Sequence, residues 1–157
     1  MLLEEQLVKK IKELGCTITT AESCTGGLLA GRILNVSGAS DVYNEGHITY
    51  SNEAKERILG VNHETLEQYG AVSSQTAAEM AEGAAKTAKA DIGLSTTGIA
   101  GPGGGTPEKP VGLIYLGCHY KGQNFTKKCN FSGNREENRR DAVEASLEFA
   151  KEILSKY

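Results

Sequence analysis

The stretch that decides the fold is Val111-Gly112-Leu113-Ile114-Tyr115-Leu116-Gly117-Cys118-His119-Tyr120. Successive side chains of a strand point to opposite faces of the sheet. Both alternating sets of this stretch are apolar: Val111, Leu113 and Tyr115 on one face, and Ile114, Leu116 and Cys118 on the other. A strand of this kind is typical of the centre of a sheet that is covered on both faces. We therefore expect an α/β fold with this strand in its middle.

The segments after this strand extend the same sheet and end the chain in a helix. Lys121-Gly122 predicts a hairpin turn. Apolar and polar side chains then alternate over 125–131, which predicts an antiparallel strand with one wetter face. Asn134, with Glu137 three residues later, predicts the start of a long helix. The apolar side of that helix consists of Val143, Leu147, Ala150 and Leu154.

Helices and short strands alternate in the part of the chain before the central strand. Apolar residues at helical spacing and capping signals predict helices over residues 3–14, 26–34, 52–60, 63–69 and 74–89, the last rich in alanine. Strands are expected at residues 17–21, 46–50 and 92–96. This alternation predicts a three-layer α/β/α sandwich. A length of 157 residues suits one domain with its own core.

Composition excludes several classes of function. The 17 Lys and Arg residues against 20 Asp and Glu give a net charge of -3, so no general attraction for nucleic acid is expected. Glu4 and Glu5 stand where a secretory signal would be apolar, and no apolar run reaches the length of a membrane span. We therefore expect a cytoplasmic protein with no membrane partner. Ala-rich helix faces permit packing between copies, as in a homo-oligomer.

The four cysteines give no sign of a metal centre. They are scattered, without a Cys-x-x-Cys pair and without histidine at the spacing of metal ligands. A reducing compartment also disfavours disulfides. We expect no metal site and buried free thiols at Cys16, Cys24, Cys118 and Cys129.

A second informative stretch is Thr20-Ala21-Glu22-Ser23-Cys24-Thr25-Gly26-Gly27, which ends a predicted strand just before an apolar helix. One interpretation is a nucleophile presented at a strand-to-helix turn. The other is a Ser or Thr helix cap followed by glycines that let the helix pack closely. Taken alone, these eight residues favour the cap.

The glycine-rich loop over residues 97–110 matches neither familiar nucleotide-binding pattern. A Walker loop fails because Gly103 is followed by Gly104, and a dinucleotide fingerprint fails because Thr106 stands where glycine is needed. Its bare backbone N–H groups can still converge on an anion or an oxyanion. The alternative is a flexible surface loop, but its length favours a function. The candidate binding residues are Thr97, Gly98, Gly101, Gly103, Gly104, Thr106 and Lys109.

A tyrosine and a lysine follow another predicted strand. The Tyr-x-x-x-Lys pattern of short-chain dehydrogenases fails because Ala54 stands where lysine is needed, and Lys55 comes one residue later. Lysine can serve as the general base for a serine when its pKa falls from about 10.4 toward neutrality. Tyr50 could then relay or orient the proton. The alternative is that Lys55 is a solvated lysine on a helix face.

Three arginines lie in the first two turns of the final helix. Arg135 and Arg139 share a helix face, and Arg140 follows them. A guanidinium group beside a helix N-terminus suits a phosphate. The alternative is a solvated helix start in which Glu136 and Glu137 pair with the arginines.

Taken in order, these motifs resemble the CinA C-terminal domain family, whose characterised members are nicotinamide-nucleotide amidases, also called NMN deamidases. The resemblance spans nearly the whole chain and implies one such domain over residues 1–157. Two positions depart from the usual pattern, where Asn134 and Asn138 replace an aspartate and an aliphatic residue. The motifs that carry the resemblance are residues 21–27, 50–55, 70–73, 97–102 with 109–112, and 131–140.

The resemblance implies a mixed five-stranded sheet and hydrolysis of the carboxamide of nicotinamide mononucleotide (NMN) to nicotinate mononucleotide and ammonia, with no metal or organic cofactor. It places the nucleophile at Ser23 and the assisting groups at Tyr50 and Lys55. Thr25 and Gly26 then join the residues expected to bind the pyridine nucleotide. Cys24 is a rival nucleophile. A domain that binds a nucleotide or a partner protein without turnover is the alternative function.

Overall fold

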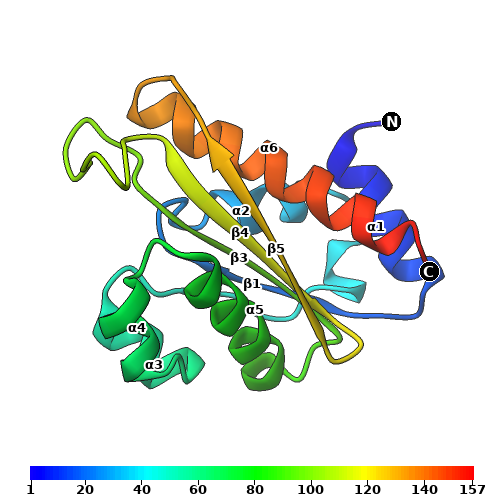
Figure 1. Cartoon of the computed structure of the whole chain (residues 1–157). Helices are drawn as coiled ribbons and strands as arrows, with labels where there is room; N and C mark the ends of the chain where they lie inside the picture. The colour runs from blue at the N-terminus through cyan, green and yellow to red at the C-terminus, as the bar shows by residue number, and fades with distance from the viewer.

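The computed structural model describes residues 1–157, and its centre is one five-stranded sheet in the order β2-β1-β3-β4-β5 (Figure 1). β1 runs parallel to β2 and β3, whereas β4 runs antiparallel to β3 and β5. The predicted mixed five-stranded sheet is therefore confirmed. The strands are β1 (Ile18–Glu22), β2 (His47–Ile48), β3 (Ile92–Gly98), β4 (Leu113–Tyr120) and β5 (Gln123–Asn130).

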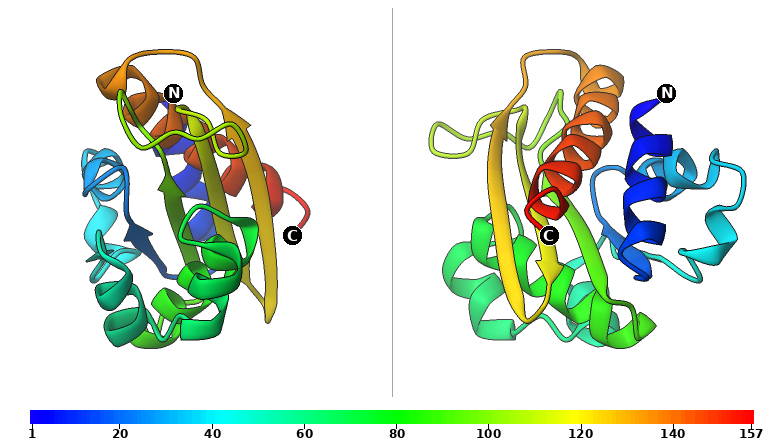
Figure 2. Two further views of the ribbon diagram at one scale, coloured as in Figure 1. Left: turned by 60° about the vertical axis from the view of Figure 1, so that its left-hand side comes forward. Right: turned by 90° about the vertical axis from the view of Figure 1, so that its right-hand side faces the viewer.

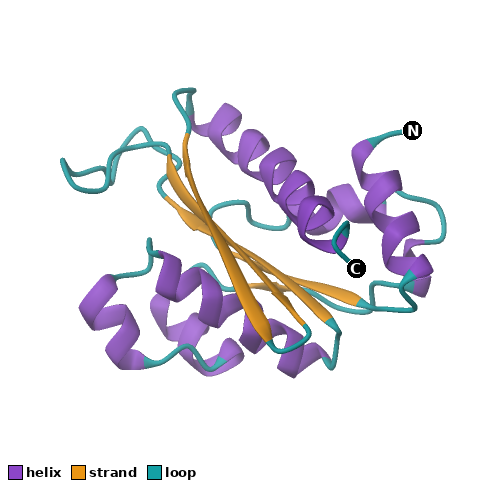
Figure 3. Ribbon diagram, turned by 45° about the vertical axis from the view of Figure 1, so that its right-hand side comes forward, coloured by secondary structure: helices purple, strands orange, loops and turns teal.

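Helices cover both faces of the sheet, which confirms the three-layer sandwich (Figure 3). One layer consists of α1 (Leu3–Glu13), α2 (Leu28–Leu34) and α6 (Arg135–Leu154). The other consists of α3 (Asn52–Leu59), α4 (His63–Tyr69) and α5 (Ser74–Ala88). A short 3-10 helix, η1 (Ala39–Asp41), lies between α2 and β2. No helix combines the length and the apolar character that a membrane span needs.

β4 is an internal strand that lies next to the edge strand β5, so the middle strand of the sheet is β3 and not β4 as expected. Both faces of β4 are nevertheless covered, as its sequence predicts. Ile114, Leu116 and Cys118 are buried in the core beneath α1, α2 and α6. On the other face, α5 lies against the strand backbone, because a Cβ atom added at Gly117 would come within 2.4 Å of the Ala77 carbonyl oxygen. The small residues of α5 and the glycine of β4 thus let helix and sheet meet at backbone distance.

The observed start of α2 differs from the sequence prediction. α2 begins at Leu28 rather than at residue 26, because Gly26 and Gly27 have φ angles of 54° and 102°, which a helix does not allow. α3 begins at Asn52 as predicted, and Ser51 caps it by accepting a hydrogen bond from the Ala54 N–H group. The predicted capping box at the start of α6 is confirmed, and all four cysteines are free.

Candidate active site

The three parallel strands bring the candidate residues to one edge of the sheet. The carboxyl ends of parallel strands meet at the same edge, where open α/β sheets place their binding sites. Ser23 follows β1, Tyr50 lies two residues after β2, and Thr97 lies near the end of β3. The Ser23 N–H group donates a hydrogen bond of 3.0 Å to the Thr96 carbonyl oxygen, which ties the turn after β1 to β3.

Ser23 and Lys55 are directly hydrogen-bonded in a buried position. Lys55 Nζ donates to Ser23 Oγ at 3.0 Å and to the Thr49 carbonyl oxygen at 2.8 Å. The exposed fraction is 1% for Lys55 and 8% for Ser23. Burial lowers the pKa of Lys55 from 10.5 to about 8, because a charged amine loses its hydration there. Lys55 is therefore not a solvated surface lysine, and it can accept a proton near neutral pH.

The cap of α2 is the carboxylate of Glu22, so the serine does not serve as the cap. Glu22 accepts hydrogen bonds from the N–H groups of Leu29 at 2.8 Å and Ala30 at 3.0 Å, and from the Thr25 hydroxyl at 2.5 Å. Sequence reasoning missed this role. The available signal was a carboxylate at the end of an otherwise uncharged strand, just before a helix that lacks its own side-chain cap.

Cys24 is placed less well than Ser23 for nucleophilic attack. Its side chain is buried, and burial raises the pKa of the thiol to about 11. The reactive form of cysteine is the thiolate, which a buried thiol with this pKa scarcely populates at neutral pH. The geometry therefore favours the Ser23 hydroxyl.

The side chain of Tyr50 does not contact the Ser23–Lys55 pair in the structure. The side chain of Tyr50 is 65% exposed, and its hydroxyl accepts a hydrogen bond from Arg135 at 3.2 Å. Only the carbonyl oxygen of Tyr50 approaches Lys55 Nζ, at 3.5 Å. The phenol makes no hydrogen bond to Ser23 or Lys55, because the short strand β2 turns into α3 with the ring facing outward.

The glycine-rich loop lies near the site only at its base. Its tip, which includes Gly103, Gly104 and Thr106, is exposed and projects from the body of the molecule (Figure 2). Lys109 holds the returning limb by donating to the Tyr69 carbonyl oxygen at 2.5 Å. No hydrogen bond joins the tip to the turn at Ser23, so the expected cradle of loop N–H groups is not formed by those residues.

Two residues at the base of this loop, Thr97 and Gly98, make contacts that hold neighbouring elements together. The Thr97 hydroxyl donates to the Ala71 carbonyl oxygen at 2.8 Å. A Cβ atom at Gly98 would come within 2.6 Å of the Ile114 Cα atom, so that glycine is needed for the pairing of β3 with β4. These two residues are therefore explained by packing.

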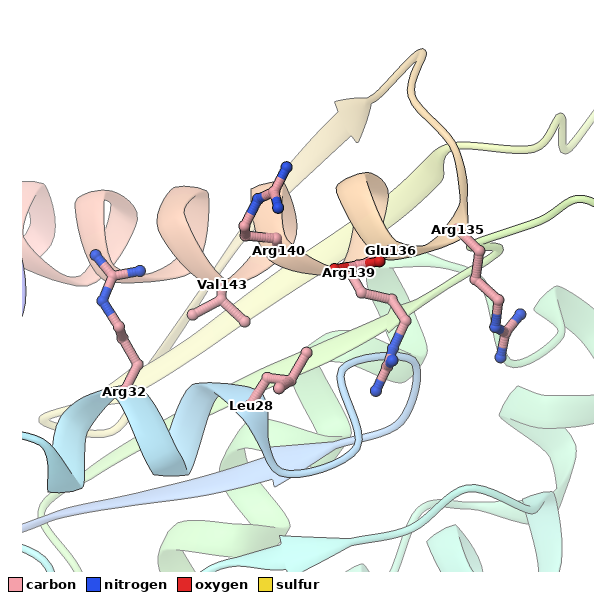
Figure 4. A pocket seen from close by; sticks show the side chains of 7 residues that line it. All are labelled: Leu28, Arg32, Arg135, Glu136, Arg139, Arg140 and Val143. Carbon is pink, nitrogen blue, oxygen red and sulfur yellow. The ribbon is translucent and has the colours of Figure 1, made fainter.

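The three arginines take different positions around a cavity between α2 and α6. Arg139 donates to the carbonyl oxygens of Cys24 and Thr25, whereas Arg135 donates to the Gly101 carbonyl oxygen at 2.8 Å. None of the three forms a salt bridge, so the pairing with neighbouring glutamates is not seen. The cavity has a volume of about 610 Å³ and is lined by Leu28, Arg32, Arg135, Glu136, Arg139, Arg140 and Val143 (Figure 4).

This arginine-lined cavity adjoins the serine without containing it. Ser23 and Lys55 do not line the cavity, but Arg139 lines it and also contacts the backbone directly after Ser23. The substituted Asn138 is fully buried beside Arg139, where its amide donates to the carbonyl oxygens of Ala100 and Gly133, both at 3.0 Å. The asparagine thus packs as a hydrogen-bonded link instead of an apolar group.

The structure offers no ready-made metal site. No group of three or more His, Cys, Asp and Glu side chains is arranged to hold an ion. The chemistry available at this edge of the sheet is that of a hydroxyl, a buried amine and backbone N–H groups.

The fold and the site define an α/β protein with a buried serine–lysine pair at the carboxyl edge of its parallel strands. Residues 2–154 match the CinA C-terminal domain family, and the chain belongs to that family. A CinA-like protein of Kosmotoga olearia is 56% identical over 152 residues, which are 97% of this chain. The chain spans only 37% of the length of that relative.

Solved structures agree with this membership. The competence/damage inducible protein CihA of Agrobacterium tumefaciens has a TM-score of 0.93 and 42% identity, covering 98% of this chain and 93% of its own. A CinA superfamily protein of Klebsiella pneumoniae has a TM-score of 0.95 and 34% identity, covering 99% and 97%. The mixed sheet and its helical layers are thus shared with proteins of this superfamily.

Proposed function

We propose that this chain is an amidohydrolase that converts NMN to nicotinate mononucleotide and ammonia. The observation that carries the proposal is the 3.0 Å hydrogen bond between Lys55 Nζ and Ser23 Oγ, made by an amine whose pKa burial lowers to about 8. A serine becomes a useful nucleophile when an adjacent base can take its proton. The choice of NMN rests on the resemblance of the motifs to nicotinamide-nucleotide amidases.

The reaction has two stages. Neutral Lys55 takes the Ser23 hydroxyl proton as Oγ bonds to the carboxamide carbon, and the protonated amine then donates that proton to the departing nitrogen, which leaves as ammonia. The resulting ester is hydrolysed by a water molecule whose proton passes to Lys55. Nicotinate mononucleotide leaves, and the Ser23 hydroxyl regains its proton.

The turn after Ser23 supplies donors for the oxyanion. The N–H groups of Cys24 and Thr25 donate to no oxygen of the protein. Backbone donors directed at the developing negative charge are a major source of rate enhancement in acyl transfer. These two groups replace the tip of the glycine-rich loop in this role.

The arginine-lined cavity favours a substrate that carries a phosphate, because its guanidinium groups can bind an anion. The chain as a whole has a net charge of -3, yet four arginines line this one cavity next to the Ser23 turn. Arg135 and Arg140 are the arginines whose positions best suit a phosphate, since Arg32 is paired with Glu4 and Glu144. For Tyr50 to assist the proton transfer, its exposed ring has to turn from Arg135 toward Lys55.

The direct test is to incubate the purified chain with NMN between pH 6 and 10, which are values on either side of a lowered lysine pKa of about 8, and to measure ammonia and nicotinate mononucleotide. We expect equal amounts of the two products. Tight NMN binding by calorimetry without any product would instead support the non-catalytic binding domain.

A further inference from the structure

Three successive carbonyl groups, beginning with that of Ser23, are each held by a hydrogen bond. The Ser23 carbonyl oxygen accepts from the Gly26 N–H group at 3.2 Å. The Cys24 carbonyl oxygen accepts from Arg139 Nε at 2.8 Å, and the Thr25 carbonyl oxygen accepts from Arg139 Nη2 at 3.2 Å. One side chain, 115 residues away in the sequence from Cys24, therefore fixes two of the three peptide planes.

Holding a carbonyl group also fixes the N–H group of the next residue. The peptide unit is planar and trans, so its C=O and N–H groups point in opposite directions. The bond to the Ser23 carbonyl thus orients the Cys24 N–H group, and the bond from Arg139 to the Cys24 carbonyl orients the Thr25 N–H group. Arg139 and the Thr25 N–H group therefore lie at opposite edges of the same peptide unit.

These two N–H groups belong to buried residues and donate to no oxygen of the protein. The exposed fraction is 5% for Cys24, and Thr25 is fully buried. Leaving a buried donor without an acceptor costs about 1–3 kcal/mol, so native structures rarely keep one without a reason. In this turn all three carbonyl oxygens accept hydrogen bonds, whereas the Cys24 and Thr25 N–H groups have no oxygen acceptor. An oxyanion site requires such N–H groups.

We propose that Arg139 is a positioning residue that holds the oxyanion donors of the Ser23 turn, instead of the phosphate ligand that its place on α6 suggests. This role rests on the proposed function. The planar fork of arginine spans two carbonyl groups at once, which a lysine amine at the same position does not do. The turn is held from its other side by Glu22, which binds the Thr25 hydroxyl and the first N–H groups of α2.

The first test separates positioning from phosphate binding by steady-state kinetics with NMN. We expect Arg139→Met and Arg139→Lys to lower kcat roughly 10²-fold, the loss typical of one oxyanion donor, with KM little changed. Arg140→Met is the contrasting variant, because Arg140 lines the same cavity, makes no hydrogen bond to the turn and is a proposed phosphate ligand; we expect it to raise KM and to leave kcat nearly unchanged. A raised KM with unchanged kcat in Arg139→Met would overturn the proposal.

Partial unfolding alone would also lower the apparent kcat at unchanged KM, so kcat is calculated per folded molecule of each variant. Urea unfolding of each variant checks that the fold is retained, and Arg139→Lys provides a milder change if Arg139→Met is too unstable to study. Full activity in Arg139→Lys would also overturn the proposal, because a single charged amine would then suffice.

The second test needs no NMN turnover. A phosphonofluoridate probe bonds its phosphorus to Ser23 Oγ and releases fluoride, while its phosphoryl oxygen occupies the oxyanion position; mass spectrometry measures the rate. We expect Arg139→Met to slow labelling roughly 10²-fold. Arg57→Met changes an exposed arginine that pairs with Glu53, and it should leave the labelling rate nearly unchanged. Equal rates in the wild-type protein and Arg139→Met would overturn the role of Arg139.

The same labelling separates this proposal from the proposed function. If the wild-type protein is labelled, Arg139→Met is slowed and NMN is not hydrolysed, the choice of substrate is wrong and the role of Arg139 is supported. If Ser23 of the wild-type protein is not labelled at all, the nucleophile is wrong and both proposals are overturned.

Discussion

Lys55 Nζ lies 3.0 Å from Ser23 Oγ, although the two residues are 32 positions apart in the sequence. The parallel pairing of β1 with β2 explains this approach, because Ala21 lies opposite His47 and the two strands end at the same edge of the sheet. α3 follows β2 at this edge, and the Lys55 side chain of α3 reaches the turn that contains Ser23. The pair is therefore a consequence of the sheet topology.

The activity should depend on the protonation of Lys55. Its pKa is lowered to about 8, and only the neutral amine can take the Ser23 proton. We expect kcat/KM for NMN to rise tenfold per pH unit below about pH 8 and to level off above it. Initial rates between pH 6 and 10 check this, and a rate that is constant across pH 7 to 9 would contradict it.

The same pKa predicts how the stability of the fold changes with pH. The unfolded chain holds the lysine proton up to its ordinary pKa of 10.5, whereas the folded chain loses it near 8. Between these values the unfolded state binds more protons, so the contribution of Lys55 to the free energy of unfolding rises with pH, by about 3 kcal/mol in all.

The comparison with Lys55→Met isolates this contribution from that of other groups, such as the thiols of Cys24 and Cys118, whose pKa values burial raises. We expect the wild-type protein to gain stability relative to Lys55→Met as the pH rises from 7.5 to 10.5, the range set by these two pKa values. Urea unfolding at each pH measures the difference. A difference that does not vary with pH would show that the pKa of Lys55 is not lowered.

Cys24 should be dispensable for chemistry. Because the pKa of its thiol is raised to about 11, roughly one molecule in a thousand carries the thiolate at pH 8. We expect Cys24→Ala to keep most of the kcat of the wild-type protein, and iodoacetamide at pH 8 to alkylate Cys24 very slowly in the folded state. Loss of turnover in Cys24→Ala, with Ser23→Ala still active, would reverse the assignment of the nucleophile.

Glu22 should contribute strongly to stability through its three hydrogen bonds at the start of α2. An amide at this position keeps one acceptor oxygen where the carboxylate has two. We expect Glu22→Gln to lower the free energy of unfolding by about 1–3 kcal/mol, as measured by urea unfolding. Glu148→Gln, an exposed change on α6, is the control; equal stability of the two variants would refute the capping role.

Much of the fold was predictable because its signals are local. The two-sided apolar pattern of β4 identified an internal strand covered on both faces, and the Asn134 capping box identified the start of α6. The predicted start of α2 is wrong because Gly26 and Gly27 take positive φ angles and because the helix is capped by Glu22, which comes earlier in the chain.

The site was predictable in its residue types more than in its contacts. Ser23 and Lys55 do meet, because strands that run parallel share an edge. The direction of the Tyr50 ring and the partners of Arg139 depend on side-chain packing between distant segments, which spacing along the chain does not encode. The same holds for the glycine-rich loop, whose length indicated a function but not which of its residues face the serine.

The measurement that tests the central claim most directly is ammonia release from NMN by the wild-type protein, Ser23→Ala and Lys55→Met, assayed side by side at pH 9. Ser146→Ala is the matched control, since Ser146 is also buried but its hydroxyl makes no hydrogen bond. The account predicts ammonia from the wild-type protein and Ser146→Ala, and only the background rate from Ser23→Ala and Lys55→Met. Ammonia release by Ser23→Ala at the wild-type rate would contradict it.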